Sequence, residues 1–332
     1  MEKFGKVIVK LRIPILILSF LLLIPSAIGY FNTRVNYDIL YYLPNEIETM
    51  QGQDILMDDF NKGAYAMVVV QNMDTKSTDR LIKKVENVDH VAQVISYTGI
   101  VGEDVPSEIV PSKFRKYFEN DSTDTTLFAI FFDNTTSSDD TMNAIIQIRE
   151  QTEGQAFISG MSAVVTDTKN LSEKETPLYV LIAVVLVCIV LAIFMDSFLV
   201  PVFFMISIGM AIVYNLGSNI LLGEVSYITK ALAAVLQLGV TLDYSIFLWH
   251  SYKEMKEIYP DDHKEAMAVA ISNTLTSVVG SSITTVAGFI ALCFMSFTLG
   301  LDLGIVMAKG VVFGVIGCVT ILPSLILTFD RA

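Results

Sequence analysis

Charged residues are scarce in this chain of 332 residues. Only 17% are Asp, Glu, Lys or Arg, whereas 53% are hydrophobic and the mean hydropathy is +0.56. A soluble domain carries roughly 25% charged residues, so the composition excludes a chain made only of ordinary soluble domains. The places where the uncharged residues gather therefore decide between membrane spans and a large core.

Cysteine and histidine are also rare, with three residues of each. Cys188, Cys293 and Cys318 each fall within an apolar block, which indicates small apolar residues and no disulfide framework. The chain has no GxxxxGK[ST] motif, no GxGxxG after a predicted strand and no clustered Cys/His spacing for a metal. Three scattered histidines support no Ser-His-Asp arrangement. We therefore expect no enzyme, no cofactor and no metal, and an ion gradient as the source of any work.

The net charge of −13 is unevenly distributed. Between Phe31 and Thr176 we count about 24 acidic and 12 basic residues, so this segment carries nearly all of the excess. An acidic, water-facing segment argues against nucleic acid as a partner. The sequence thus predicts a membrane part and an acidic part exposed to water.

Six apolar stretches are long enough to cross a bilayer, which needs about 20 residues. They cover residues 13–30, 177–195, 198–217, 228–249, 276–297 and 303–327. The first is preceded by Lys3, Lys6, Lys10 and Arg12, as in a signal peptide. Its apolar run is longer than that of a signal peptide and no clear small-x-small cleavage site closes it. We therefore expect a retained span.

The distribution of Lys and Arg predicts the orientation. Basic residues lie at the N-terminus, in the loop 250–265 (Lys253, Lys256 and Lys264) and at Arg331, while the loops 218–227 and 298–302 have none. Both termini are therefore expected in the cytoplasm. Only Asp196 and Ser197 separate spans two and three, which predicts an antiparallel hairpin.

The segment between spans one and two has the pattern of a folded α+β domain. Strands are predicted at 64–71, 90–98, 126–134 and 155–160, and helices at 77–88 and 139–152. This βαβ, loop, βαβ order indicates a ferredoxin-like sandwich, followed by a short amphipathic helix at 163–176. The expected organisation is a cytoplasmic N-terminus with helix one (1–30), an extracellular domain (31–176) and transmembrane helices two to six (177–332).

Asp243, in VTLDYSIFLW, is the sharpest candidate for function. A carboxylate in the middle of a span costs about 2.5–3.5 kcal/mol on insertion scales, and such residues usually face a bundle interior or a water-filled path. The alternative is an acid held by a hydrogen-bonded network or an ion pair, with no further role. At 100° per residue Gly239, Phe247 and His250 share its face, while Gln237, Thr241 and Ser245 form a neighbouring polar stripe beyond Tyr244.

Other polar residues could support Asp243. Lys309 in span six is a possible ion-pair partner, although the two residues differ in depth by roughly 13 Å, and Lys309 could instead snorkel outward. His250 could exchange protons with the cytoplasm or be an interfacial residue beside Trp249. Span five carries small and hydroxyl residues, which favour close packing and could form a polar wall opposite Asp243. They are Thr276, Ser277, Gly280, Ser281, Ser282, Thr284, Thr285 and Gly288.

One span, a large outer domain and five further spans with an Asp-Tyr pair in span four resemble half of a resistance–nodulation–cell division (RND) transporter. The resemblance is closest to the MmpL-type (MMPL) branch of Gram-positive bacteria. QLGVTLDYSIFL (237–248) is similar to its Gly-x-x-x-Asp-Tyr signature, with support from YDILYYLPNE (37–46), FISGMSAVVTD (157–167) and the Ser/Gly-rich span five.

The resemblance implies a proton-driven exporter of lipids or other hydrophobic molecules in a bacterial plasma membrane. It implies that Asp243 carries the proton and that Tyr244 is its hydrogen-bonding partner. From their position in span five, Ser281, Thr284 and Thr285 are possible supporting residues, as are His250 and Lys309. Family members normally contain two such halves, so this chain is expected to need a second half or a second copy. The alternatives are a non-transporting module, lipid-sensing (as in sterol-sensing proteins) or scaffolding, and an accessory of the protein-export machinery.

Overall fold

The structure is a computed structural model that describes residues 2–60, 63–102, 105, 109–120, 122–152, 154–195 and 199–329. The chain divides into two compact units. One comprises Met1–Asn36 with Ser172–Ala332, and the other comprises Tyr37–Leu171. The predicted hairpin residues Asp196 and Ser197 and the terminal Arg331 lie outside the described residues.

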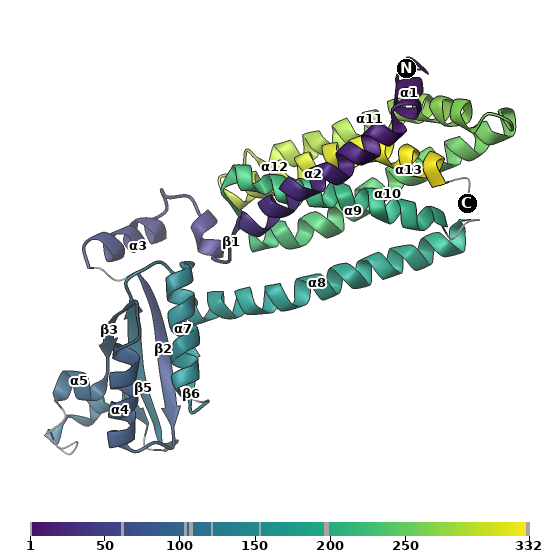
Figure 1. Ribbon diagram of the computed structural model, residues 1–332. Helices are drawn as coiled ribbons and strands as arrows, with labels where there is room; N and C mark the ends of the chain where they lie inside the picture. Colours follow the sequence, from purple (N-terminus) through teal and green to yellow (C-terminus); the bar gives the residue numbers. More distant parts are fainter. Residues whose placement is uncertain are drawn as a thin grey trace. The chain divides into compact units, whose positions relative to one another are not determined.

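The first unit is a helical bundle with six helices long and apolar enough to span a membrane, which confirms the predicted number. These spans are Arg12–Asn32, Met161–Ile193, Leu199–Leu222, Tyr227–Ile258, His263–Leu292 and Leu299–Phe329. Figure 1 shows the helices of this unit, which lie side by side except for α8, which runs apart from the others. They are α2 (Arg12–Asn32), α8 (Met161–Phe194, shared with the other unit), α9 (Leu199–Gly217), α10 (Tyr227–Ile258), α11 (His263–Leu292), α12 (Leu299–Ile316) and α13 (Leu322–Phe329), preceded by the short α1 (Glu2–Lys10).

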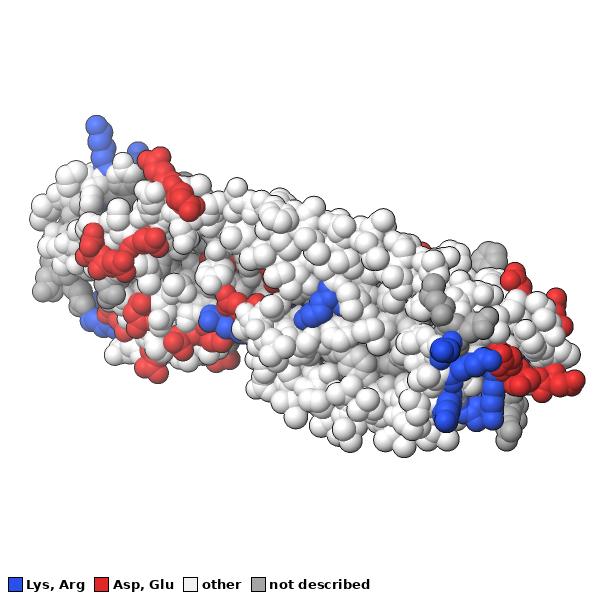
Figure 2. Space-filling view, turned by 90° about the horizontal axis from the view of Figure 1, so that it is seen from above, with Lys and Arg blue, Asp and Glu red and all other residues white. Residues whose placement is uncertain are grey.

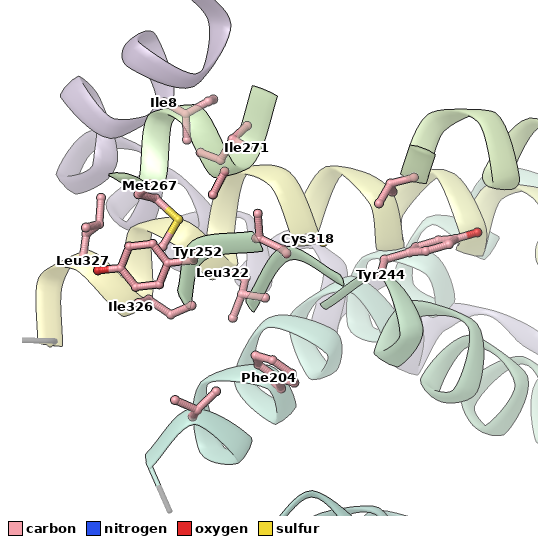
Figure 3. Close-up of a cluster of buried hydrophobic side chains, with 14 of the residues drawn as sticks. Ile8, Phe204, Tyr244, Tyr252, Met267, Ile271, Cys318, Leu322, Ile326 and Leu327 are labelled. Atoms are coloured by element: carbon pink, nitrogen blue, oxygen red, sulfur yellow. The ribbon is translucent and has the colours of Figure 1, made fainter. Parts of the chain in front are cut away.

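The centre of the bundle is formed by the last span, in which a π-helical turn (Gly317–Ile321) joins α12 to α13. In this span 72% of the most apolar stretch is buried, against 11% in α11. Figure 3 shows part of the apolar core, in which Phe204 of α9, Tyr252 of α10 and Leu322 of α13 meet. The bundle therefore has an inner helix, α12–α13, surrounded by helices with one free side.

Glycines set the closest helix contact of the bundle. A Cβ on Gly29 of α2 would lie 2.1 Å from the carbonyl oxygen of Gly217, and one on Gly217 of α9 would lie 2.1 Å from that of Ser26. Small residues at such crossings allow membrane helices to pack backbone against backbone. Just beyond the crossing, β1 (Arg34–Asn36) pairs in parallel with β7 (Glu224–Ser226), which closes this end of the bundle.

The second unit contains an antiparallel sheet with the strand order β3-β5-β2-β6. Its strands are β2 (Ala64–Gln71), β3 (Val91–Ile95), β5 (Thr125–Phe132) and β6 (Ala156–Ser159), and the short β4 (Glu119–Asn120) pairs with β5. The main helices α4 (Thr75–Glu86) and α7 (Asp139–Thr152) follow β2 and β5 along the chain. Asp74 caps α4 by accepting a hydrogen bond from the backbone N–H of Ser77.

Both helices share one core with the sheet. Val68 of β2, Val85 of α4 and Ile145 of α7 are fully buried in the same cluster. Alternate residues of β2 point to the opposite face, where the side chains of Tyr65 and Met67 are about half exposed.

Several boundaries differ from the expectations. The amphipathic helix expected at 163–176 is the first part of the single helix α8, which continues past Pro177. Helix α11 starts at His263 and ends at Leu292, so the apolar residues 293–297 follow the helix although hydropathy placed them in span five. The second unit has further helices within the predicted loops. They are η1 (Ile39–Tyr42), α3 (Glu48–Asp58), α5 (Tyr97–Val101) and α6 (Ser112–Arg115).

The glycine crossing gives a test of the packing. Gly217→Ala forces a methyl group against the backbone of α2, which we expect to cost about 1–3 kcal/mol of stability. Gly209→Ala on the same helix meets nothing within 4 Å and should be neutral or gain up to about 1 kcal/mol of helix propensity. Thermal unfolding of the purified variants in detergent measures the difference. Equal melting temperatures would contradict the crossing.

Candidate functional site: the polar residues of the membrane bundle

Asp243 lies in the middle of α10, on the free side of the helix. Its side chain is exposed, as are those of Phe247 and His250 and the position of Gly239 on the same face. Among the described residues, no hydrogen bond or salt bridge holds Asp243. The carboxylate expected to face a bundle interior is therefore on the outer surface of the bundle that this one chain forms.

Tyr244 points in a different direction from its neighbour. It is 4% exposed and belongs to the apolar core. In Figure 3 it stands at one end of the cluster, with its hydroxyl group directed away from Tyr252 and Met267. Successive residues of a helix point about 100° apart. Asp243 therefore lies on the surface of the bundle, while the adjacent Tyr244 lies in its interior. No hydrogen bond joins them in the described part of the chain.

The small and hydroxyl residues of α11 lie on the surface beside α10. Asn273 donates to Met255 Sδ of α10 at 3.9 Å, and Gly280 and Thr284 point within about 20° of Asn273 on the helical wheel. The exposed members of the stripe are Thr276, Ser277, Gly280, Ser281, Thr284 and Gly288. Together with Gly239 and Asp243 we call them the α10–α11 face.

The α10–α11 face lies midway along both helices. Asp243 lies about 15 residues from the end of α10, and Val278, next to the stripe, about 15 residues from the start of α11. Ser281, Thr284 and Thr285 donate their hydroxyl protons to carbonyls of their own helix. Gly239 and Gly280 have nothing within 4 Å of a hypothetical Cβ. Another helix can therefore approach this face closely.

Lys309 of α12 is part of a hydrogen-bonded network inside the bundle. Its ammonium group donates to the backbone carbonyl of Asn215 at 3.0 Å and to Asn219 Oδ1 at 2.6 Å. Asn215 Nδ2 in turn donates to Gln237 Oε1 of α10 at 3.0 Å. No salt bridge between Lys309 and Asp243 occurs among the described residues. The network ties α12 to α9 and α10 and directs Lys309 away from the depth of Asp243.

Three polar atoms next to this network have no partner within the described chain. Asn215 Oδ1, Gln237 Nε2 and Thr241 Oγ1 are fully buried. Two glycines of α12 let its backbone approach these groups closely, because a Cβ on Gly310 would clash with Asn215 Nδ2 and one on Gly314 would clash with Thr241 Oγ1. The interior beside α12 is therefore tightly packed around polar atoms that lack a partner among the described residues.

Asp302 was not among the residues that the sequence singled out. Its Oδ2 accepts from the backbone N–H of Ser226 at 2.8 Å and from Thr229 Oγ1 at 2.6 Å. It therefore fixes the start of α12 to the start of α10. The sequence signal that could have identified Asp302 is an acidic residue in GLDLG (300–304), at the start of an apolar span. Its partners come from another helix and could not be identified from spacing along one helix.

The remaining candidates have no contact with Asp243 that the described residues record. His250 is exposed, about two turns beyond Asp243 on the same face. Ser282 is buried and donates to the carbonyl of Val279 in its own helix. No group of three His, Cys, Asp or Glu side chains within the described ranges is placed to hold a metal ion.

The model of the MMPL family matches residues 42–332. A membrane protein of Methanocaldococcus jannaschii is 24% identical over 96% of this chain and 91% of the relative. The apo-petrobactin exporter of Bacillus anthracis is 21% identical over 93% of this chain and 42% of the exporter. The membrane protein ActII-3 of Streptomyces coelicolor is 36% identical, over 38% of this chain and 18% of the relative.

Solved structures show the same fold. SecDF from Thermus thermophilus, a translocon-associated membrane protein, aligns with a TM-score of 0.54 and 15% identity over 98% of this chain. A second structure of SecDF, in the super-membrane-facing form, has a TM-score of 0.50 and 14% identity. This chain covers 38% of each SecDF chain. It is thus comparable in length to the archaeal relative and less than half as long as the exporter and SecDF.

The buried network predicts a coupling between Lys309 and Asn219. Asn219→Ala removes the side-chain acceptor of a half-buried ammonium group, which should cost about 1.5–3 kcal/mol of stability. In the Lys309→Met background the same substitution should cost less than half as much, because no ammonium group needs the acceptor. Denaturant unfolding of the four proteins in detergent gives the coupling energy. Asn32→Ala, whose amide bonds only its own helix, is the control, and additive effects would contradict the network.

Proposed function

The chain belongs to the MMPL family, and we propose that it is a six-span half of a proton-driven exporter of lipids or other hydrophobic molecules. The observation that carries this proposal is the position of Asp243. It is an acid midway along α10, without a hydrogen-bonding partner among the described residues, beside glycine and hydroxyl residues of α10 and α11. An intramembrane acid of this kind typically marks a proton or substrate path.

Protonation of Asp243 would remove a charge from the middle of the membrane. The neutral acid tolerates an apolar or weakly polar surrounding far better than the carboxylate does. Binding and release of one proton therefore change the preferred surroundings of α10, which is how a proton gradient would move this helix. Tyr244, placed beside Asp243 at the rim of the core, is the proposed hydrogen-bonding partner, while His250 and Lys309 are assigned supporting roles.

A second half or a second copy of this chain is the proposed partner of the α10–α11 face. Exposure of the charged Asp243 to lipid would cost a free energy of about 2.5–3.5 kcal/mol. A facing helix with polar groups would offset this cost. The open glycines and the satisfied hydroxyl groups of α11 suit close helix packing. The chain spans 42% of the exporter, as a half would, and 91% of the Methanocaldococcus jannaschii relative, which is of comparable length.

The domain at 31–176 is the proposed ferredoxin-like porter domain on the outer side of the bacterial plasma membrane, with both termini in the cytoplasm. The order β3-β5-β2-β6 with two βα units supports the fold. The basic residues near the N-terminus and in the loop 250–265 support the orientation. Tyr65, Met67 and Phe157 are exposed on strands β2 and β6, and such apolar surface could guide a hydrophobic substrate.

The fold match to SecDF favours one alternative, an accessory of the protein-export machinery. A lipid-sensing module without transport is the other. Energy dependence separates transport from sensing, because a protonophore stops an exporter and leaves the binding of a sensor unchanged. Secretion of a reporter protein separates an export accessory from a lipid exporter.

Asp243→Asn keeps the size of the side chain and removes its titration, so we expect export to stop while membrane insertion is unchanged. Efflux of Nile red from energised cells measures transport of a hydrophobic probe. A protonophore should reduce wild-type efflux to the same level. Asp261→Asn, in the loop that joins α10 to α11, is the charge-matched control and should export normally. Wild-type efflux from the Asp243→Asn variant would overturn the proposed proton role.

The proposed partner face can be tested by cross-linking. Cys188, Cys293 and Cys318 are first replaced by alanine, and Ser281→Cys is introduced on the α10–α11 face. If a second copy covers this face, oxidation should give a covalent dimer in membranes. Ile206→Cys, on an exposed part of α9, should stay monomeric. If neither variant forms a dimer, the partner is a different half and not a second copy.

A further inference from the structure

A basic hollow lies at the end of the bundle opposite β1 and β7. It has a volume of about 500 Å³ and opens where α1, α2 and the start of α11 meet. Helix α2 separates the two ends of the bundle by about 30 Å. Its lining residues are Lys6, Val9, Lys10, Arg12, Ile13, Pro14, Asp262, Lys264, Glu265 and Ala268. Figure 2 shows the gathering of Lys and Arg beside Asp and Glu at one end of the bundle.

Part of the charge in this hollow is already paired. Lys6 forms a salt bridge of 2.8 Å with Glu265, and Asp262 caps α11 by accepting from the backbone N–H groups of Lys264 and Glu265 at 3.0 Å. The ammonium groups of Lys10 and Lys264 have no carboxylate partner among the described residues. The hollow thus has an excess of positive charge at the level where a membrane surface begins.

The guanidinium group of Arg12, the first residue of α2, is held by a hydrogen bond. Its Nη1 donates to the carbonyl oxygen of Leu327, near the end of α13, at 3.1 Å. An Arg side chain carries five N–H donors, so donors are left for an anion in the hollow. Arg12 therefore adds a fixed positive group to the two unpaired lysines.

An apolar groove starts at the same place. It has a volume of about 630 Å³, and its lining consists of Ile13, Leu16, Ile17, Phe20, Leu21 and Ile24 of α2 with Thr328 at the end of α13. Ile13 lines both the basic hollow and the groove, so the two adjoin at this residue. From Ile13 to Ile24 the groove follows α2 for about 16 Å, which is half the thickness of a hydrocarbon core, or one leaflet.

We propose that the hollow and the groove together hold one anionic phospholipid. Its phosphate group lies among Lys10, Arg12 and Lys264, and one acyl chain follows α2 from Ile13 to Ile24. The charge excess selects an anionic headgroup, and the adjoining apolar groove selects a lipid over free phosphate. The inference goes beyond the proposed function, because a resident lipid at this place needs neither transport nor Asp243.

The bound lipid would fasten α1 to the bundle. Ile8 and Val9 of α1 are buried, and a Cβ on Gly5 would lie 2.1 Å from the carbonyl oxygen of Ala268. Helix α1 therefore already contacts α11 through its backbone, while its Lys6 and Lys10 line the hollow. An anion between Lys10 of α1 and Lys264 of α11 adds an electrostatic link between the same two helices.

The headgroup site is tested with the purified full chain in a neutral detergent. Dioleoyl phosphatidylglycerol and dioleoyl phosphatidylcholine are titrated, and lipid-bound protein is counted by native mass spectrometry. We expect tighter binding of phosphatidylglycerol, weakened about 30-fold by the double variant Lys10→Gln/Lys264→Gln, or about fivefold for each lysine. Lys3→Gln removes the same charge from α1 outside the hollow and should change binding less than twofold.

The acyl-chain site is tested with a matched pair of tryptophans on α2. Ile17→Trp fills the groove and should weaken phosphatidylglycerol binding several-fold. Ile28→Trp, equally exposed on the same helix but outside the groove, should leave binding unchanged. Unaltered melting temperatures without lipid show that the variants are folded.

Three results would overturn the proposal. Equal binding of the two lipids would exclude recognition of the anionic headgroup. If Lys3→Gln and the double variant lost phosphatidylglycerol binding equally, the lipid would be attracted by the basic surface in general and not by the hollow. Displacement of phosphatidylglycerol by millimolar inorganic phosphate would identify a site for phosphate alone.

Discussion

The hydrogen bonds of the Lys309 ammonium group are the interaction on which the bundle depends most. Little water is available to solvate a charged group in a membrane interior, so its hydrogen-bonding partners must come from the protein. Asn215 and Asn219 provide them, and Gln237 extends the network to a third helix. The requirement fixes how α9, α10 and α12 are rotated about their axes. It also explains the glycines of α12, which bring its backbone against the polar groups of its neighbours.

Asp243 has the same need for polar partners, but its surroundings differ from those of Lys309. The chain supplies partners for Lys309 and Asp302, yet none of the described residues bonds Asp243. This contrast between Asp243 and the two satisfied groups, Lys309 and Asp302, supports the proposed partner at the α10–α11 face independently of the lengths of the relatives.

The number of spans, and the strands and helices between spans one and two, could be read from the sequence, because hydropathy and periodicity are local properties. The partners of Lys309 could not. Asn215 and Asn219 lie at the end of an apolar span, where sequence reasoning sees only the approach to a loop. The outward direction of Asp243 was equally hidden: the helical wheel groups it with Gly239 and His250, but the side of α10 that faces the bundle is decided by the other helices. The lipid groove along α2 is a product of packing, because its residues read as an ordinary span.

The arrangement around α10 limits how a proton could reach Asp243 within the proposed mechanism. The buried polar stripe of Gln237, Thr241 and Ser245 lies about 120–200° around the helix from Asp243, so the polar groups beside α12 do not reach the carboxylate directly. Tyr244 lies at about 100°, between that stripe and the acid, with its ring in the core. A small rotation of the phenol could therefore relay a hydrogen bond from the interior to the α10–α11 face. An Asp-Tyr pair at adjacent positions is thus useful because its two members face different surroundings. The acid faces the partner half, and the phenol connects it to the polar interior.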